Sequence, residues 1–258
     1  MRKTILLQLA LLAMISTNIM AQSKFSKEVF MSENGDSLLY RQLEPQTIDA
    51  NTKYPLVLFL HGAGERGNDN KAQLQHGAMM FTNPVNLDNY PTFALFPQCP
   101  TDSYWAPVNR GGKKDETFFP YEAPMPPTLQ AVKELLDEFI SNNPIDTNRI
   151  YIMGLSMGAM GTFEMVCRYS DLFAAAIPIC GGVNTKRLQQ VETSTSFRIY
   201  HGDADPVVPV EFSRDAYTTL EAKDVDVEYI EFPGVDHNSW TPAFNMPDFM
   251  KWIFSQSK

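Results

Sequence analysis

The chain has 258 residues, of which 44% are hydrophobic and 12% aromatic, a composition typical of globular proteins. Its net charge of −9 at pH 7 argues against nucleic acid and anionic membrane surfaces as partners. Residues 22–258 provide the length that one α/β domain with a full core requires. We therefore expect a single domain over 22–258.

The first 21 residues have the pattern of a secretory signal peptide. Arg2 and Lys3 precede an apolar run over residues 5–15, and mostly small or polar residues follow up to Ala21. The run is shorter than the ~20 residues of a membrane span, so a membrane anchor is the weaker alternative. No cysteine lies near the expected cut after Ala21, so a lipid attachment site is not expected. We predict a secreted or periplasmic protein without stable membrane insertion after cleavage.

Strand and helix patterns alternate over the rest of the chain. Residues 28–30 and 38–43 flank Asn34-Gly35-Asp36, which predicts an antiparallel hairpin. Short apolar runs predict further strands, and apolar residues spaced by three and four predict helices between them. The predicted strands lie at 55–60, 92–96, 149–153, 174–179, 197–200 and 227–232, and the predicted helices at 129–140, 157–169, 211–222 and 246–255.

This alternation indicates βαβ units and a mainly parallel sheet with helices on both faces. The hairpin adds antiparallel strands at one edge of that sheet. Residues 102–125 are long and irregular for a plain connection, and long loops in compact domains are often functional. The stretch 181–196 is too short to hold a large cap domain, so we expect an α/β fold with an open cleft.

The strongest chemical signal is the motif Gly154-Leu155-Ser156-Met157-Gly158, which fits G-x-S-x-G. A predicted strand precedes it and a predicted helix follows it, as a nucleophile elbow requires. The sharp turn exposes the serine, and small residues on either side let neighbouring backbones pass closely. At a helix N-terminus, developing negative charge is also stabilised. We predict Ser156 as the nucleophile; the alternative is a glycine-rich turn with a capping serine.

A serine hydroxyl needs an adjacent base to become a good nucleophile. In this architecture the chain order is serine, acid, histidine, and two histidines follow Ser156. His201 ends a predicted strand, where a packing role is expected. His237 follows the last predicted strand and can reach over the sheet edge, so we predict His237 as the base. The remaining histidines are His61 and His76.

The acid must lie between the serine and the base, at the end of a strand. The segment after the strand at 197–200 offers Asp203 and Asp205. We predict that Asp205 accepts the imidazole N–H of His237 and fixes its tautomer. Asp203 is expected to cap the turn, and Asp236 to form hydrogen bonds within its own loop.

An oxyanion hole needs two backbone N–H donors. Met157, directly after the nucleophile, is expected to supply one. The loop at 61–67, after the strand at 55–60, is expected to supply the other from Ala63, with Gly62 as the alternative. His61 is expected to be structural.

The sequence contains no pattern of a metal or nucleotide site. There is no H-E-x-x-H motif, no cysteine pair at zinc spacing and no dinucleotide fingerprint in the right context. We therefore expect neither a metal nor a cofactor. We interpret the three cysteines, Cys99, Cys167 and Cys180, as buried thiols, although one disulfide among them is possible by count.

Five segments together resemble a known family: LHGAGERG, FPQCP, GLSMGAMGTFEM, HGDADPVVP and DHNSW. They are similar to the bacterial phospholipase/carboxylesterase and dienelactone-hydrolase-like esterases, in particular the secreted predicted peptidases and feruloyl-type carbohydrate esterases. The resemblance implies the α/β-hydrolase fold, the triad Ser156, Asp205 and His237, and the oxyanion donors Ala63 and Met157. Dienelactone hydrolases proper use a cysteine nucleophile, so their own activity is not expected here.

Several residues near the predicted site are candidates for substrate contact. Trp105 and Trp240 lie in loops and either stack on a sugar or aryl ring or pack the loops onto the sheet. Glu65 and Arg66 either pair to shape the oxyanion loop or contact substrate.

Taken together, these features predict a serine carboxylic-ester hydrolase that forms an acyl-enzyme. Resemblance and predicted export point to acyl esters of carbohydrates, of the feruloyl or acetyl type, free or linked to polysaccharide. A serine peptidase, a lipid acyl hydrolase on the same triad, and a catalytically silent glycan-binding module are the alternatives.

Overall fold

Long apolar runs form the central strands of the protein. In the computed structural model, which describes residues 23–109, 111, 113 and 117–258, β3 (Tyr54–Leu60) is buried along all seven residues. The side chains of Leu56, Leu58 and Leu60 enter one core layer, and those of Val57 and Phe59 enter the other. This alternation is expected of a strand covered on both faces. The predicted signal peptide lies outside the described residues.

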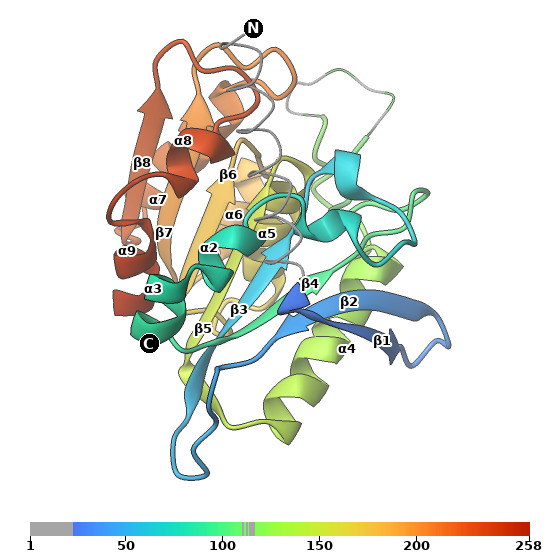
Figure 1. Ribbon diagram of the computed structural model, residues 1–258. Helices are drawn as coiled ribbons and strands as arrows, with labels where there is room; N and C mark the ends of the chain where they lie inside the picture. Colours follow the sequence, from blue (N-terminus) through green and yellow to red (C-terminus); the bar gives the residue numbers. More distant parts are fainter. Residues whose placement is uncertain (1–22, 110, 112, 114–116) are drawn as a thin grey trace, which may run out of the picture.

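One sheet of eight strands organises the described residues, in the order β1-β2-β4-β3-β5-β6-β7-β8 (Figure 1). β1 and β2 pair antiparallel, β2 and β4 pair antiparallel, and the remaining pairs are parallel. The strands are β1 (Ser26–Met31), β2 (Ser37–Leu43), β3, β4 (Phe93–Pro97), β5 (Ile145–Leu155), β6 (Ala175–Ile179), β7 (Ser196–Gly202) and β8 (Val227–Phe232).

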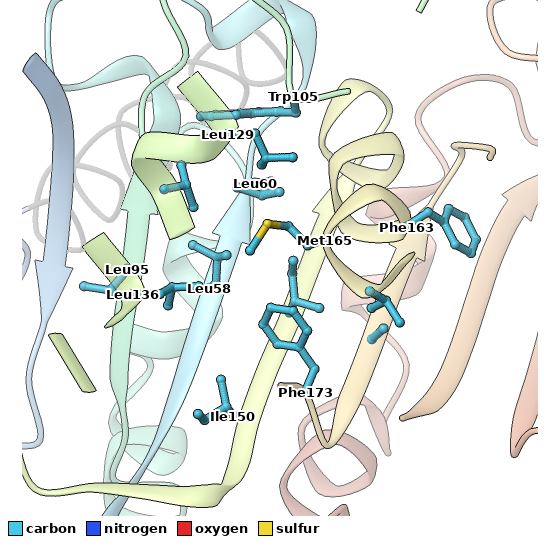
Figure 2. Close-up of a cluster of buried hydrophobic side chains, with 14 of the residues drawn as sticks. Leu58, Leu60, Leu95, Trp105, Leu129, Leu136, Ile150, Phe163, Met165 and Phe173 are labelled. Atoms are coloured by element: carbon cyan, nitrogen blue, oxygen red, sulfur yellow. The ribbon is translucent and has the colours of Figure 1, made fainter. Parts of the chain in front are cut away.

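Helices cover both faces of the sheet, as the two core layers show. Residues of α4 (Pro127–Asn142), α5 (Met157–Arg168), α6 (Thr185–Gln190) and α7 (Glu211–Glu221) belong to one layer. The other layer contains residues of α2 (Ala78–Thr82), α3 (Pro84–Asn89), α8 (Trp240–Phe244) and α9 (Phe249–Ser255). Two 3-10 helices, η1 (Ala63–Glu65) and η2 (Ala72–Leu74), lie after β3. Figure 2 shows the first layer, where Leu58, Leu136 and Met165 come from β3, α4 and α5.

This arrangement confirms the predicted α/β architecture with its N-terminal antiparallel hairpin. The stretch 181–196 contains only the six-residue helix α6, so it forms no cap. The short helices α2, α3, α6 and α8 had no counterpart in the sequence prediction, because each is too short to display a helical repeat. Within the described part of the chain, no helix has the length and apolar character needed to cross a membrane.

Candidate active site

Ser156 lies at the sharp turn between β5 and α5. Its backbone has φ 53° and ψ −115°, in the left-handed half of conformational space that non-glycine residues rarely adopt. The Ser156 N–H donates to the carbonyl oxygen of Ile179 at 2.8 Å, which ties the turn to the end of β6. A strained backbone held in this way is characteristic of functional sites.

The two glycines of the motif are required by close backbone contacts. A Cβ atom on Gly158 would lie 1.9 Å from the Leu60 carbonyl oxygen, and one on Gly154 would lie 2.3 Å from the Gly158 carbonyl oxygen. The backbone of helix α5 therefore passes so close to the backbones of β3 and β5 that only glycine, which has no Cβ atom, fits at these two positions. The positions of the two glycines in the G-x-S-x-G motif are thus required by backbone packing at the turn as well as by the chemistry of the serine.

We expect Gly158→Ala to lower the free energy of unfolding by about 3 kcal/mol or more, because the new methyl group overlaps backbone atoms that cannot rotate away. Gly64→Ala is the matched control, since a Cβ there meets nothing within 4 Å, and it should change stability by less than about 0.5 kcal/mol. Urea unfolding of the two variants measures both values. Equal stability of the variants would contradict the close approach of α5 to β3.

The side chains of Ser156, His237 and Asp205 form one hydrogen-bonded chain. The distance from His237 Nε2 to Ser156 Oγ is 2.9 Å, and that from His237 Nδ1 to Asp205 Oδ2 is 2.7 Å. His237 lies 81 residues from Ser156 in sequence, in the loop between β8 and α8. The structure therefore brings together the three residues proposed for the triad, in the order that proton transfer from a serine requires.

The carboxylate of Asp205 is fully buried and surrounded by donors. Burial by itself would raise its pKa, but hydrogen bonds from His201 and His237 and from the backbone N–H groups of Val208 and Val207 lower the pKa below its ordinary value. Asp205 is therefore ionised beside His237 throughout the neutral range. Of the neighbouring aspartates, Asp203 accepts from Gly234 N–H at 2.6 Å and Asp236 accepts from Asn238 N–H at 3.1 Å, both within loops.

A cavity of about 360 Å³ opens beside Ser156 and His237. Gly62, Ala63, Gly64 and Glu65 from the loop after β3 line it, as does Trp240 from α8. The rest of the wall is largely apolar and comes from Tyr104, Phe118, Leu155, Met160, Val207, Val208 and Phe212. Ala63 thus lines the same cavity as Ser156. Met157, the residue after Ser156, is the first residue of α5. Tyr104, Phe118 and Phe212 were not recognised from the sequence, because they come from three separate segments.

The structure overturns substrate contact, one of the two roles considered for Trp105, and supports packing. Trp105 is completely buried, its Nε1–H donates to the His61 carbonyl oxygen at 3.0 Å, and it packs among Leu60 and Leu129 (Figure 2). The aromatic ring belongs to the core because α4 and α5 leave an apolar space that the loop after β4 fills. Trp240, in contrast, lies against the His237 ring at 5.6 Å and lines the cavity.

Glu65 lines the cavity, but its expected pairing with Arg66 is not formed. The guanidinium of Arg66 donates instead to the carbonyl oxygens of Ala63, Thr101 and Ser103. Arg66 therefore joins the loop after β3 to the loop after β4. The Glu65 carboxylate lies 3.7 Å from His76 Nε2. His76 also lies 5.2 Å from the Trp240 ring, a proximity that no local sequence signal indicated.

His61 has a structural position, with 1% of its surface exposed. Its Nε2 accepts the Cys99 N–H at 3.0 Å, and its Nδ1 lies 2.6 Å from the Gly62 carbonyl oxygen. The imidazole therefore links the loop after β3 to the end of β4. Burial lowers the pKa of His61 to about 4, with a smaller lowering from Arg66, while the contact with Gly62 acts in the opposite direction.

Stability should therefore decrease between about pH 6.5 and pH 4. Unfolded His61 has a pKa of about 6.5, so the unfolded chain binds more protons in this range and is favoured as the pH falls. We expect a loss of about 3 kcal/mol from this group, complete near its folded pKa. Urea unfolding of the wild type and of His61→Gln across this range should give a smaller pH slope for the variant. An identical slope would show that His61 is protonated in the folded protein.

One group of metal-type donors, Cys180, Asp205 and His237, has its ligand atoms within 4.8 Å of one another among the described residues. Asp205 and His237 are already hydrogen-bonded to each other. Burial raises the pKa of the Cys180 thiol to about 12, so it is protonated and a poor ligand. The group is not a suitable metal site. Cys99, Cys167 and Cys180 form no disulfide with one another; Cys99 and Cys180 are buried and Cys167 is partly buried.

The sequence model of phospholipases and carboxylesterases matches residues 47–253. The chain belongs to the phospholipase/carboxylesterase family. The elbow, the histidine loop and the segment of Asp205 all lie inside the matched range. This confirms the family resemblance inferred from the five sequence segments.

Three proteins of known identity or structure are similar to this family member. Poly(3-hydroxyalkanoate) depolymerase C of Paucimonas lemoignei is 27% identical over 177 residues, which cover 67% of this chain and 37% of the depolymerase. A thermostable esterase of known structure is 36% identical with a TM-score of 0.81, covering 93% of this chain and 64% of the esterase. This chain thus spans less than two thirds of both proteins.

The third is a ferulic acid esterase from Anaeromyces mucronatus, whose structure contains ferulic acid. It is 18% identical with a TM-score of 0.65, covering 88% of this chain and 89% of the esterase. At this identity the likeness concerns the fold.

Proposed function

We propose that this member of the family is a serine carboxylesterase that works through an acyl-enzyme. The observation that carries the proposal is the hydrogen-bonded chain from Ser156 through His237 to Asp205 at the wall of an apolar cavity. A turn, a base and a buried carboxylate in this relation are what a serine needs to attack a carbonyl group. All three are present, which argues against a catalytically silent module.

The reaction begins when Ser156 Oγ attacks the ester carbonyl carbon while His237 Nε2 takes the hydroxyl proton. The imidazolium, stabilised by Asp205, returns that proton to the alcohol oxygen as the C–O bond breaks, and the acyl group remains on Ser156. His237 then takes a proton from water, which attacks the acyl-enzyme, and the proton passes to Ser156 Oγ as the acid leaves. Asp205 stays ionised throughout.

The backbone N–H groups of Ala63 and Met157 are assigned to the oxyanion in both steps. Ala63 lines the cavity at the start of η1, and Met157 is at the N-terminus of α5, where the helix dipole favours negative charge. Removing one such donor typically costs about 10²–10³ in rate.

The substrate we propose is an acyl ester of a carbohydrate, with a feruloyl or acetyl group. An aryl acyl group suits the wall that Phe118 and Phe212 form, their rings stacked at 6.0 Å. Glu65 and Trp240 also line the cavity, and they offer a hydrogen-bond acceptor and a ring face to sugar hydroxyls and a sugar ring. Free or polysaccharide-linked substrate is accommodated alike, since the stretch 181–196 forms no cap over the cleft.

A fluorophosphonate probe and a panel of esters test the proposal. We expect the probe to label Ser156, located by peptide mass spectrometry, and the panel to show hydrolysis of feruloyl or acetyl sugar esters. No labelling of folded protein would favour the silent glycan-binding module. Labelling with cleavage of peptide amides, or of long-chain lipid esters, in preference to sugar esters would replace the substrate assignment by one of those classes.

A further inference from the structure

The carboxylate of Asp205 has four hydrogen-bond donors, two on each oxygen. Oδ1 accepts the backbone N–H groups of Val207 at 2.7 Å and Val208 at 2.9 Å. Oδ2 lies 2.7 Å from His237 Nδ1 and 3.2 Å from His201 Nε2. A carboxylate has about four lone-pair positions, so this group is saturated. Two of its four donors are imidazole rings, and only one of them belongs to the proposed triad.

His201 is completely buried at the end of β7, and its hydrogen positions follow from its neighbours. Nε2 faces two acceptors, Asp205 Oδ2 and the Val208 carbonyl oxygen at 3.1 Å, so it must carry a hydrogen. Nδ1 lies 2.7 Å from Ser213 Oγ. That contact is shorter than the 3.3 Å from Ser213 Oγ to the Gly181 carbonyl oxygen, so the hydroxyl hydrogen is assigned to Nδ1.

We propose that His201 is a positioning residue for the esterase reaction, which orients the Asp205 carboxylate toward His237. The inference rests on the proposed function, because it concerns the acid of the triad. Two imidazoles meet on one oxygen, so the chain Ser213–His201–Asp205–His237–Ser156 is continuous from α7 to α5. His201 does not line the cavity, so its effect on substrate passes through Asp205.

The packing around Asp205 makes the His201 contact necessary. The carboxylate is shielded from water, so a lost donor cannot be replaced without rearrangement. Without the N–H of His201, Oδ2 is held from one side only and the carboxylate can rotate away from His237 about the bonds to Val207 and Val208. The carboxylate also becomes more basic, because one hydrogen bond that stabilised its charge is gone.

Two other titratable groups near this chain do not change charge in the neutral range. Burial raises the pKa of Cys180, which lies after β6, to about 12. Glu231 on β8 is paired with Arg214, which lowers the pKa of Glu231. A shift in a kinetic pH profile near neutrality therefore does not come from Cys180 or Glu231.

The test compares His201→Asn with His201→Gln, with activities expressed per active site titrated by the fluorophosphonate probe. The glutamine amide nitrogen can occupy the position of Nε2 and donate to Asp205, whereas asparagine is too short. We expect His201→Asn to lower kcat by about 10-fold to 100-fold with KM unchanged. The acidic limb of its kcat/KM profile should move to higher pH by about 0.5 pH unit, and glutamine should restore most of both properties.

Tyr200→Phe is the matched control, since it changes a neighbouring side chain in β7 that packs in the opposite core layer, and it should behave as the wild type. Wild-type kcat and an unmoved acidic limb in His201→Asn would overturn the inference. If both His201 variants fail to fold by circular dichroism, Ser213→Ala is used, which removes one hydroxyl. The acidic limb of the kcat/KM profile of Ser213→Ala should move to higher pH by less than the shift expected for His201→Asn. An acidic limb at the wild-type position would again overturn the inference. An inert wild type would instead refute the proposed function.

Discussion

Replacing Ser156 by alanine should lower kcat/KM for ester hydrolysis by about 10⁵-fold or more. The variant keeps the cavity and the hydrogen-bond donors of the site but has no oxygen to form the acyl-enzyme. A small residual rate over water is expected from those remaining groups. Labelling by the fluorophosphonate probe should disappear, together with the pre-steady-state burst of product that an accumulating acyl-enzyme gives with excess substrate.

Ser141→Ala is a suitable control, because Ser141 lies on α4 and its hydroxyl bonds only within that helix, to Glu138. It should retain wild-type kinetics. Circular dichroism of Ser156→Ala should show that the fold is intact, since alanine occupies no more space than serine. Retained hydrolysis in a pure, folded Ser156→Ala variant would exclude this serine as nucleophile and with it the proposed mechanism.

Asp205→Asn should lower kcat by about 10⁴-fold, the size of effect seen when a triad carboxylate becomes an amide. The amide NH₂ group would face N–H donors, because every lone pair of Asp205 accepts one in the structure. His237 would then favour the tautomer with hydrogen on Nε2, which cannot accept the Ser156 proton. Steady-state kinetics at neutral pH, with active-site titration, give the value.

Asp203→Asn offers a closely matched comparison in the same segment. Asp203 Oδ1 accepts the N–H of Gly234, and the amide oxygen of asparagine can accept it as well, so activity should stay near that of the wild type. A comparable loss of kcat in both variants would indicate that the segment, not the charge of Asp205, matters. Activity near wild type in Asp205→Asn would remove Asp205 from the mechanism.

The strand and helix pattern was largely predictable because burial and periodicity are properties of local sequence. The apolar run in β3 and the spaced apolar residues of α4 both indicated the correct element. The hairpin of β1 and β2 followed from a turn signal between two strand patterns. Boundaries were less accurate: α9 begins at Phe249, three residues after the predicted start, because the preceding residues form turns rather than helix.

The site was predictable to the extent that its residues are tied to strand ends. The turn at Ser156, the segment of Asp205 and the loop of His237 each follow a strand of the parallel sheet, so they meet at one edge. The sequence left two roles open for Trp105, substrate contact and packing, because a residue that lies in a loop can still fill a gap in the core. His201 was assigned to packing, although the four-residue spacing to Asp205 was a usable signal.

The amino-acid pattern was sufficient to predict the order of the strands along the chain, the sharp turn at Ser156 and the chemical identity of the side chains that follow each strand. These features depend on neighbours within a few residues. The folded structure was needed to show that His201 shares an oxygen of Asp205 with His237, that Trp105 is buried, and that Phe118 and Phe212 form a wall beside the serine. Each of these features involves a contact between segments tens of residues apart, and the geometry of such contacts is set by how helices and loops pack on the sheet.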